Sequence, residues 1–178
     1  EAENLGSKKL VISNGEIECK DLSFSYEGKR TLLSHINAYF AGNSVTMIVG
    51  KNGSGKTSLL HLLMRFIEPQ SGAIFVDGQN INQCELRSLR RNIAIVSQDV
   101  ALSHGSIFEN ISYGHSNASS EAVEKAAKRA GAHEFILNLP SGYNTQVGDN
   151  GVLLSGGQRQ RISLARTLLL NCKIIIFD

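Results

Sequence analysis

A glycine-rich loop at residues 50–57 is the part of the sequence best suited to bind phosphate. It reads Gly-Lys-Asn-Gly-Ser-Gly-Lys-Thr, which fits the spacing G-x-x-x-x-G-K-[ST]. Three glycines let backbone N–H groups converge on anionic oxygens, and a helix starting at the loop adds its partial positive charge. We expect Lys56 to contact the β- and γ-phosphates and the Thr57 hydroxyl to bind Mg²⁺. The predicted phosphate-binding residues are Gly50, Asn52, Gly53, Ser54, Gly55, Lys56, Thr57 and Ser58.

Asp178 is a candidate second ligand for the metal. It follows the apolar run Ile-Ile-Ile-Phe at 174–177, which predicts a buried strand. In open α/β sheets, ligands gather at the carboxyl ends of the strands. A lone aspartate after a strand is usually a turn residue, but the phosphate loop favours a Mg²⁺ ligand here.

A second group of small residues lies at 155–158, where Ser155, Gly156, Gly157 and Gln158 open an expected helix. A helix start of this kind can bind an anion. One chain does not need two such sites for one triphosphate, and a plain glycine-containing helix cap is the alternative interpretation.

The elements that must position these residues alternate between strands and helices. Short apolar or alternating runs predict strands at 16–20, 45–49, 73–77, 93–97 and 174–177, with another small strand region around 32–36. Helical spacing predicts helices over 58–67, over 119–131 and from near Gly157. Such interleaving indicates an α/β layer with a largely parallel sheet, and the helix-rich span of about 99–160 is interpreted as an inserted subdomain.

The sequence Ser-Gly-Gly-Gln-Arg-Gln-Arg at 155–161, together with the phosphate loop, resembles the nucleotide-binding domain of ATP-binding cassette (ABC) proteins. The resemblance spans nearly all of residues 16–178. It implies a P-loop NTPase (RecA-like) α/β core with a mostly parallel sheet, a small antiparallel β-subdomain and a helical signature subdomain. Residues 1–13 are interpreted as a linker and residues 14–178 as the ATP-binding domain.

The same resemblance assigns roles, with ATP and Mg²⁺ as the bound species. Tyr26 matches the aromatic residue that stacks on adenine, although a core or surface tyrosine is the plainer interpretation. Gln98 matches a glutamine that touches Mg²⁺ or the attacking water. The resemblance therefore assigns Thr57, Gln98 and Asp178 to the metal site. It assigns catalytic roles to Gln98 and Lys56. Residues 155–158 would cap the γ-phosphate held by a partner domain.

Two segments indicate the exporter subtype, namely residues 105–111 and 142–148, the second of which would lie near the coupling helices of a transmembrane domain. The sequence departs from the family pattern at Ser103, at His104, at residues 149–151 and at Cys172. The function implied is the ATP-binding motor of an exporter at the cytoplasmic face of a membrane. Its partners would be a transmembrane domain and a second nucleotide-binding domain, identical or different.

The sequence ends at the aspartate that, in the family, directly precedes the catalytic glutamate, with a switch histidine further on. We therefore expect a piece of a longer polypeptide that hydrolyses ATP poorly or not at all by itself. We also expect an unpaired sheet edge where later strands would add.

Composition narrows the alternatives. The 178 residues carry 18 Lys and Arg against 16 Asp and Glu, a net charge of +2 that gives no electrostatic case for nucleic acid. A non-transport ABC ATPase of DNA repair, chromosome maintenance or translation remains the alternative, although no sustained heptads separate Thr57 from Leu154. A GTPase or a small-molecule kinase is disfavoured, because proteins of these classes do not need the Ser-Gly-Gly-Gln group at residues 155–158. Three scattered cysteines argue against disulfides and zinc.

Overall fold

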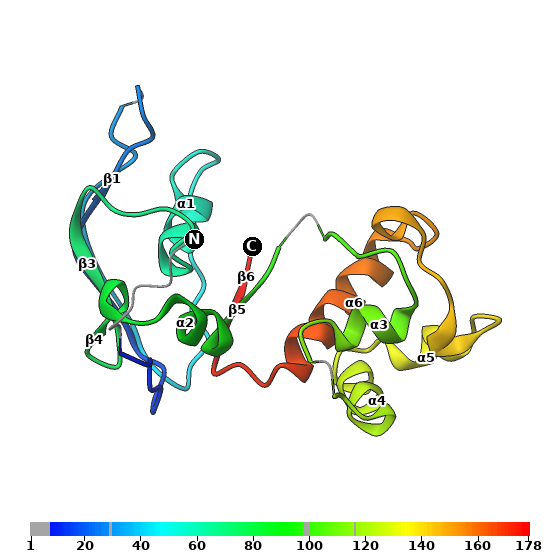
Figure 1. The fold of residues 1–178 in the computed structure, drawn as a ribbon. Helices are drawn as coiled ribbons and strands as arrows, with labels where there is room; N and C mark the ends of the chain where they lie inside the picture. The colour runs from blue at the N-terminus through cyan, green and yellow to red at the C-terminus, as the bar shows by residue number, and fades with distance from the viewer. Residues whose placement is uncertain (1–7, 29, 98–99, 116) are drawn as a thin grey trace. The chain divides into compact units, whose positions relative to one another are not determined.

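The structure is a computed structural model that describes residues 8–28, 30–97, 100–115 and 117–178. The chain forms two compact units, one up to Ile93 and one from Ala94 onward, and each is described by itself. Figure 1 shows both units, coloured along the chain.

The first unit is built on a four-stranded antiparallel sheet with the strand order β2-β1-β3-β4. The strands are β1 (Ile17–Phe24), β2 (Leu33–Phe40), β3 (Ser71–Val76) and β4 (Gln79–Asn80). In the central strand β1, Ile17 pairs with Phe40 on one side and with Val76 on the other. This sheet matches the small antiparallel β-subdomain expected from the sequence.

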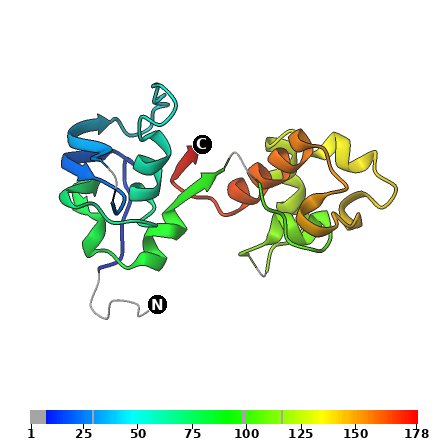
Figure 2. The ribbon, with the colours of Figure 1, turned by 90° about the horizontal axis from the view of Figure 1, so that it is seen from above.

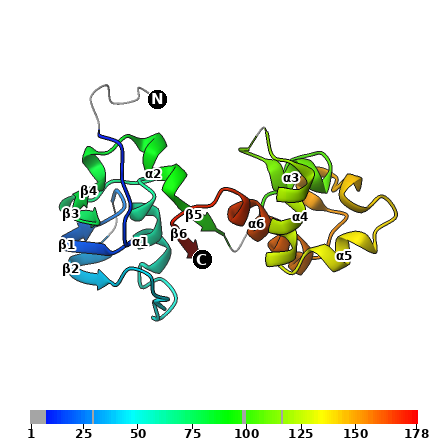
Figure 3. The ribbon, with the colours of Figure 1, turned by 90° about the horizontal axis from the view of Figure 1, so that it is seen from below.

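One face of this sheet is covered by helices, as Figures 2 and 3 show from two opposite sides. They are α1 (Lys56–Leu63) and α2 (Leu86–Asn92), with the short 3₁₀ turn η1 (Ile81–Gln83) before α2. Helix α1 buries four leucines, Leu59, Leu60, Leu62 and Leu63. The predicted helix over 58–67 therefore exists, but it begins two residues earlier and ends four residues earlier.

The segment before β1 packs against the same unit. Leu10 is buried, and its backbone N–H donates to Ser88 Oγ at 2.9 Å. Further along, Asp77 accepts hydrogen bonds from the backbone N–H groups of residues 13–16. Residues 8–13, assigned to a linker from the sequence, are thus attached to the sheet and to α2.

The prediction of a buried strand at 45–49 is wrong for this structure. The segment forms no strand, and Val45, Met47 and Val49 are largely exposed. A buried strand needs hydrogen-bonded neighbours. In the described residues, β1–β4 pair among themselves and β5 pairs with β6, so no strand borders this segment.

The second unit contains four helices and a two-stranded sheet among its described residues. The strands are β5 (Ile93–Val96), at whose start the boundary falls, and β6 (Ile174–Phe177). The helices are α3 (Ile107–Ser112), α4 (Ser120–Arg129), α5 (His133–Leu137) and α6 (Gly156–Leu169), with the 3₁₀ turns η2 (Gly142–Asn144) and η3 (Asp149–Gly151).

Helix α6 organises the helical part of this unit, because both α3 and α4 pack against it. The apolar core is closed by fully buried aliphatic side chains from each helix, among them Ile111, Val123, Ile136 and Ile162. The predicted helices over 119–131 and from near Gly157 are confirmed. Ser119 caps α4 as expected, accepting from the Ala122 N–H at 3.2 Å.

A buried amide fastens α3 to α6. The Asn110 side chain is 1% exposed and accepts hydrogen bonds from the Ser103 N–H and from Arg166 Nη2, both at 2.9 Å. Its own amide donates to the carbonyls of Ser103 and Ser106. Arg166 also donates from Nε to the Asn110 carbonyl at 2.8 Å, so the buried polar groups of this pair are matched.

Candidate functional site

The phosphate loop of the first unit curls around the Lys56 ammonium group. Lys56 Nζ donates to the carbonyl oxygens of Gly50 and Lys51, each at 3.0 Å. A backbone hydrogen bond from Ser54 N–H to the Lys51 carbonyl, 3.1 Å long, closes the turn. The positive charge is therefore held at the mouth of the loop, where an anion would meet it.

The backbone conformation favours glycine at two positions of this loop, and a third glycine lies close to a side chain. Gly53 and Gly55 have φ angles of +75° and +94°, which L side chains rarely adopt. A Cβ at Gly55 would lie 2.8 Å from Leu33 Cδ2, and one at Gly50 would lie 2.7 Å from Ser54 Oγ. Gly55 also begins α1 without a side-chain cap, which suits a helix start that receives an anion. These features fit a triphosphate, with Lys56 beside it.

Tyr26 lies beside this loop, at its helical end. Its hydroxyl is 3.1 Å from Ser58 Oγ in α1, and its ring packs edge-on against Phe24, with 4.9 Å between ring centroids. Tyr26 is 38% exposed, whereas Phe24 and Ser58 are buried. The structure thus brings together two residues predicted for the same site, and it adds Phe24 as the support of the Tyr26 ring.

The residues expected to hold Mg²⁺ are distributed over both units. Thr57 is exposed in the first turn of α1. Asp178 directly follows β6, is exposed, and donates its backbone N–H to the Val96 carbonyl at 3.1 Å. Gln98 lies outside the described residues. The shared metal site of these three residues stays a prediction.

The small residues at 155–158 form a capped helix start in the second unit. Ser155 Oγ accepts from the Gln158 N–H at 3.3 Å, and Gln158 Oε1 accepts from the Ser155 N–H at 2.8 Å. This reciprocal capping box fixes the first turn of α6. Ser155, Gly156 and Gly157 are exposed.

Neither glycine of this helix start is needed by the chain itself. Gly156 and Gly157 have no positive φ, and a Cβ at Gly157 would meet nothing within 4 Å. A glycine that neither the backbone nor the packing requires leaves room for another group to approach the helix start closely.

The two segments with exporter-like sequence lie side by side in the second unit. Ser106 and Gln146 form an antiparallel bridge, flanked by hydrogen bonds from Ile107 N–H to the Thr145 carbonyl and from Val147 N–H to the Gly105 carbonyl. Sequence patterns found separately thus belong to one surface.

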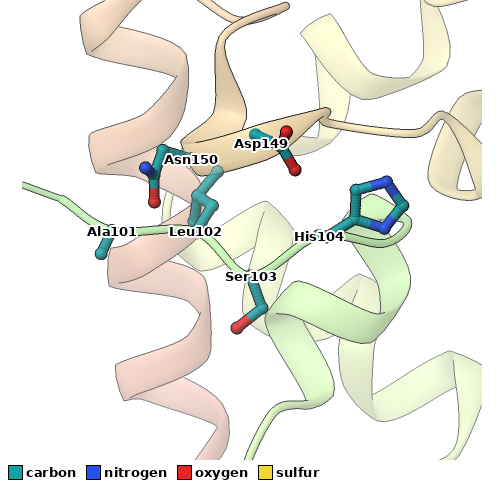
Figure 4. A pocket seen from close by; sticks show the side chains of 6 residues that line it. All are labelled: Ala101, Leu102, Ser103, His104, Asp149 and Asn150. Carbon is teal, nitrogen blue, oxygen red and sulfur yellow. The ribbon is translucent and has the colours of Figure 1, made fainter.

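An open hollow of about 570 Å³ lies next to these segments. Figure 4 shows residues 101–104 passing below the turn that carries Asp149 and Asn150. The lining includes Ser103, His104, Asp149 and Asn150, which are among the positions where the sequence departs from the family pattern. These four departures therefore lie around one hollow, whereas Cys172 is not part of its lining.

Comparison with known proteins identifies the family. The sequence model described as "ABC transporter" matches residues 33–178, which is most of the chain. The chain belongs to the ABC transporter family. An uncharacterised ABC transporter ATP-binding protein of Sinorhizobium fredii is 46% identical over 92% of the chain, which covers 28% of that protein. An ATP-dependent lipid A-core flippase of Saccharophagus degradans is 42% identical over 98% of the chain, which covers 30% of that protein.

A solved structure gives the same result. The chain of a bacterial Atm1-family ABC exporter with ATP bound superposes with a TM-score of 0.96 and 40% identity over 99% of this chain, which covers 31% of that chain. The present chain spans less than a third of the length of these relatives. Within its described residues, no helix has the length and apolarity needed to cross a membrane. Cys19 and Cys84 are free thiols.

Proposed function

We propose that this chain is the ATP-binding motor domain of an ABC exporter, which binds Mg-ATP and drives transport through ATP-dependent pairing of two such domains and ATP hydrolysis. The observation that carries the proposal is the phosphate loop, in which the Gly50 and Lys51 carbonyls hold the Lys56 ammonium group and Gly53 and Gly55 have positive φ angles. Lys56 would bind the β- and γ-phosphates, and the first N–H groups of α1 would receive their oxygens.

We propose Thr57 and Asp178 as oxygen ligands of Mg²⁺. We also propose the mostly parallel core sheet that the resemblance implies. Bound Mg²⁺ would neutralise phosphate charge during phosphoryl transfer. Gln98 would orient the attacking water.

The helix start at 155–158 would act on the nucleotide of a second nucleotide-binding domain. Its capping box leaves the outer surface of Gly156 and Gly157 uncovered, so a γ-phosphate could approach the backbone directly. Pairing that depends on ATP at both loops would then link hydrolysis to the separation of the two domains.

The membrane-embedded part of the transporter would contact the second unit at the exporter-like segments. The hollow lined by His104 and Asp149 is the surface on which a cytoplasmic segment of a transmembrane domain would rest. The relatives named for export support this assignment. The chain would then lie at the cytoplasmic face of a membrane.

The nucleotide site is tested by comparing two lysines of the same loop. Lys56→Ala removes a charge that points into the loop, whereas Lys51→Ala removes the same charge from an exposed side chain. Because a hydrogen bond to a charged group contributes about 1.5–3 kcal/mol, Lys56→Ala should weaken Mg-ATP binding by about 10- to 150-fold. Lys51→Ala should change it by less than about threefold.

The affinities are measured by calorimetric titration of the full-length protein with Mg-ATP. Equal losses in the two variants would show that general charge, rather than the Lys56 position, determines binding, and would refute the assigned site.

A further inference from the structure

The hydroxyl pair between Tyr26 and Ser58 links the adenine-stacking residue to the phosphate-binding helix. Ser58 is the third residue of α1, and its side chain is 7% exposed, so its hydroxyl lies beneath the loop rather than in solvent. The two oxygens are 3.1 Å apart, within hydrogen-bonding distance.

Tyr26 is restrained at two points of its ring. The buried Phe24 ring meets it at an interplanar angle of 82°, and Ser58 holds the hydroxyl at the opposite end. A half-exposed tyrosine without such contacts would sample several rotamers. These two contacts fix the orientation of the Tyr26 ring.

We propose that Ser58 is a positioning residue for Tyr26: its hydroxyl orients the tyrosine ring so that a purine base can stack on it while the phosphates occupy the loop. This inference rests on the proposed ATP-binding function. Ser58 then serves base recognition through Tyr26, in addition to any contact its backbone makes with phosphate.

The consequence is a coupling between the two ends of the nucleotide site. A base that stacks well requires a fixed ring, and the ring is fixed by a residue of the helix whose first turn receives the phosphates. Ordering the platform before the base arrives lowers the entropy lost on binding.

The test separates base recognition from phosphate binding. The affinities of the full-length protein for Mg-ATP and for magnesium tripolyphosphate are measured by calorimetry, and their ratio reports the contribution of the nucleoside. Ser58→Ala and Tyr26→Phe should each lower this ratio about three- to tenfold, the value of one side-chain hydrogen bond. The double variant should lose no more than either single one, and Ser58→Thr should restore the ratio.

Tyr39→Phe is the matched control, because it removes a tyrosine hydroxyl in the same unit that donates to Glu16 at 3.0 Å. It should leave the ratio unchanged. If Ser58→Ala weakens both ligands equally, Ser58 contacts phosphate only and the inference is wrong. Losses that multiply in the double variant would also overturn it.

Failure of the underlying function looks different. In that case the wild-type protein binds neither ligand. If the wild type binds both ligands but Tyr26→Ala leaves the ratio unchanged, Tyr26 is not a base platform, and the inference is wrong while the nucleotide-binding function stands.

Discussion

A single carboxylate, that of Asp77, holds the backbone of the segment that precedes strand β1 in the first unit. Its two oxygens accept N–H groups from residues 13–16, at distances from 2.6 to 3.2 Å. Partial burial raises the pKa of the Asp77 carboxyl, but these backbone hydrogen bonds outweigh it and hold the pKa below its ordinary value of 3.8. The charged form is therefore favoured by folding.

Replacing Asp77 should make the free energy of unfolding depend less on pH in the acidic range. A carboxyl with a lowered folded-state pKa stabilises the fold above its unfolded pKa, near 3.8, and loses this contribution as the pH falls through the folded value. Asp77→Asn should lower the free energy of unfolding by about 1–2 kcal/mol at pH 7. The gap to the wild type should narrow below pH 3.8.

Urea unfolding at a series of pH values measures this difference. Asp21→Asn is the control, since Asp21 is an exposed carboxylate that pairs with the His35 ring on the surface. It should cost less than about 1 kcal/mol. A constant gap between Asp77→Asn and the wild type from pH 7 to pH 3 would contradict the prediction.

At the scale of elements, α3 depends on a contact far along the chain. Six residues cannot form a stable helix alone, so α3 needs its capping box between Ser106 and Glu109 and its attachment to α6. Asn110 provides that attachment by accepting from Arg166, a half-buried residue whose pKa is lowered by burial.

Asn110→Ala should therefore destabilise the second unit strongly. The change removes the amide that bonds to Arg166 Nη2 and to the backbone N–H and carbonyl of Ser103, leaving these partly buried groups without that partner. We expect a loss of about 2–4 kcal/mol in the free energy of unfolding. Ser112→Ala in the same helix should cost less than about 0.5 kcal/mol. A loss below about 1 kcal/mol for Asn110→Ala in urea titrations would be incompatible with this role.

Elements with local signals could be predicted from the sequence, and those that depend on distant partners could not. Helix α4 was predictable because Ser119 caps it and the acidic and basic residues match its dipole. Helix α3 is too short to show a periodicity, although the Ser106-x-x-Glu109 spacing was a signal for its start. The strand predicted at 45–49 failed because apolar composition alone does not supply neighbouring strands.

The candidate site also contains features with local sequence signals and features that depend on residues far apart in the chain. The turn at 50–57 could be predicted because its backbone conformation depends on consecutive residues, with positive φ angles at Gly53 and Gly55. Its binding of phosphate stays a prediction. The contact between Tyr26 and Ser58 was not, since it joins residues 32 positions apart through the fold of β1 onto α1. The gathering of Ser103, His104 and Asp149 around one hollow likewise required the tertiary structure.

At the scale of the whole molecule, Gly157 separates folding from assembly. Since a Cβ there meets nothing in the chain, Gly157→Ala should not lower the melting temperature, and alanine's helix preference could stabilise α6 by up to about 1 kcal/mol. The added methyl group would nevertheless obstruct the approach of a partner's nucleotide. We expect ATP-dependent association of the two nucleotide-binding domains to fall at least about tenfold.

Energy transfer between labelled domains of the full-length protein, with and without Mg-ATP, measures this association. Ser120→Ala, at the exposed first residue of α4, is the control and should have no effect. Unchanged association in Gly157→Ala would rule out close approach at this helix start. A lowered melting temperature would show that the glycine is needed by the fold.

Helix α6 is anchored near its C-terminal end, so a small tilt of the helix moves its N-terminal end by a larger distance. Arg166 is clamped to Asn110, while Ser155 lies eleven residues earlier at the exposed start of the helix. At 1.5 Å per residue, the arm between them is about 16 Å long. A tilt of about 5° around the clamp would therefore displace Ser155 by about 1.4 Å, half the length of a hydrogen bond. A rotation smaller than the usual scatter of helix crossing angles would be enough to make or release a grip on phosphate.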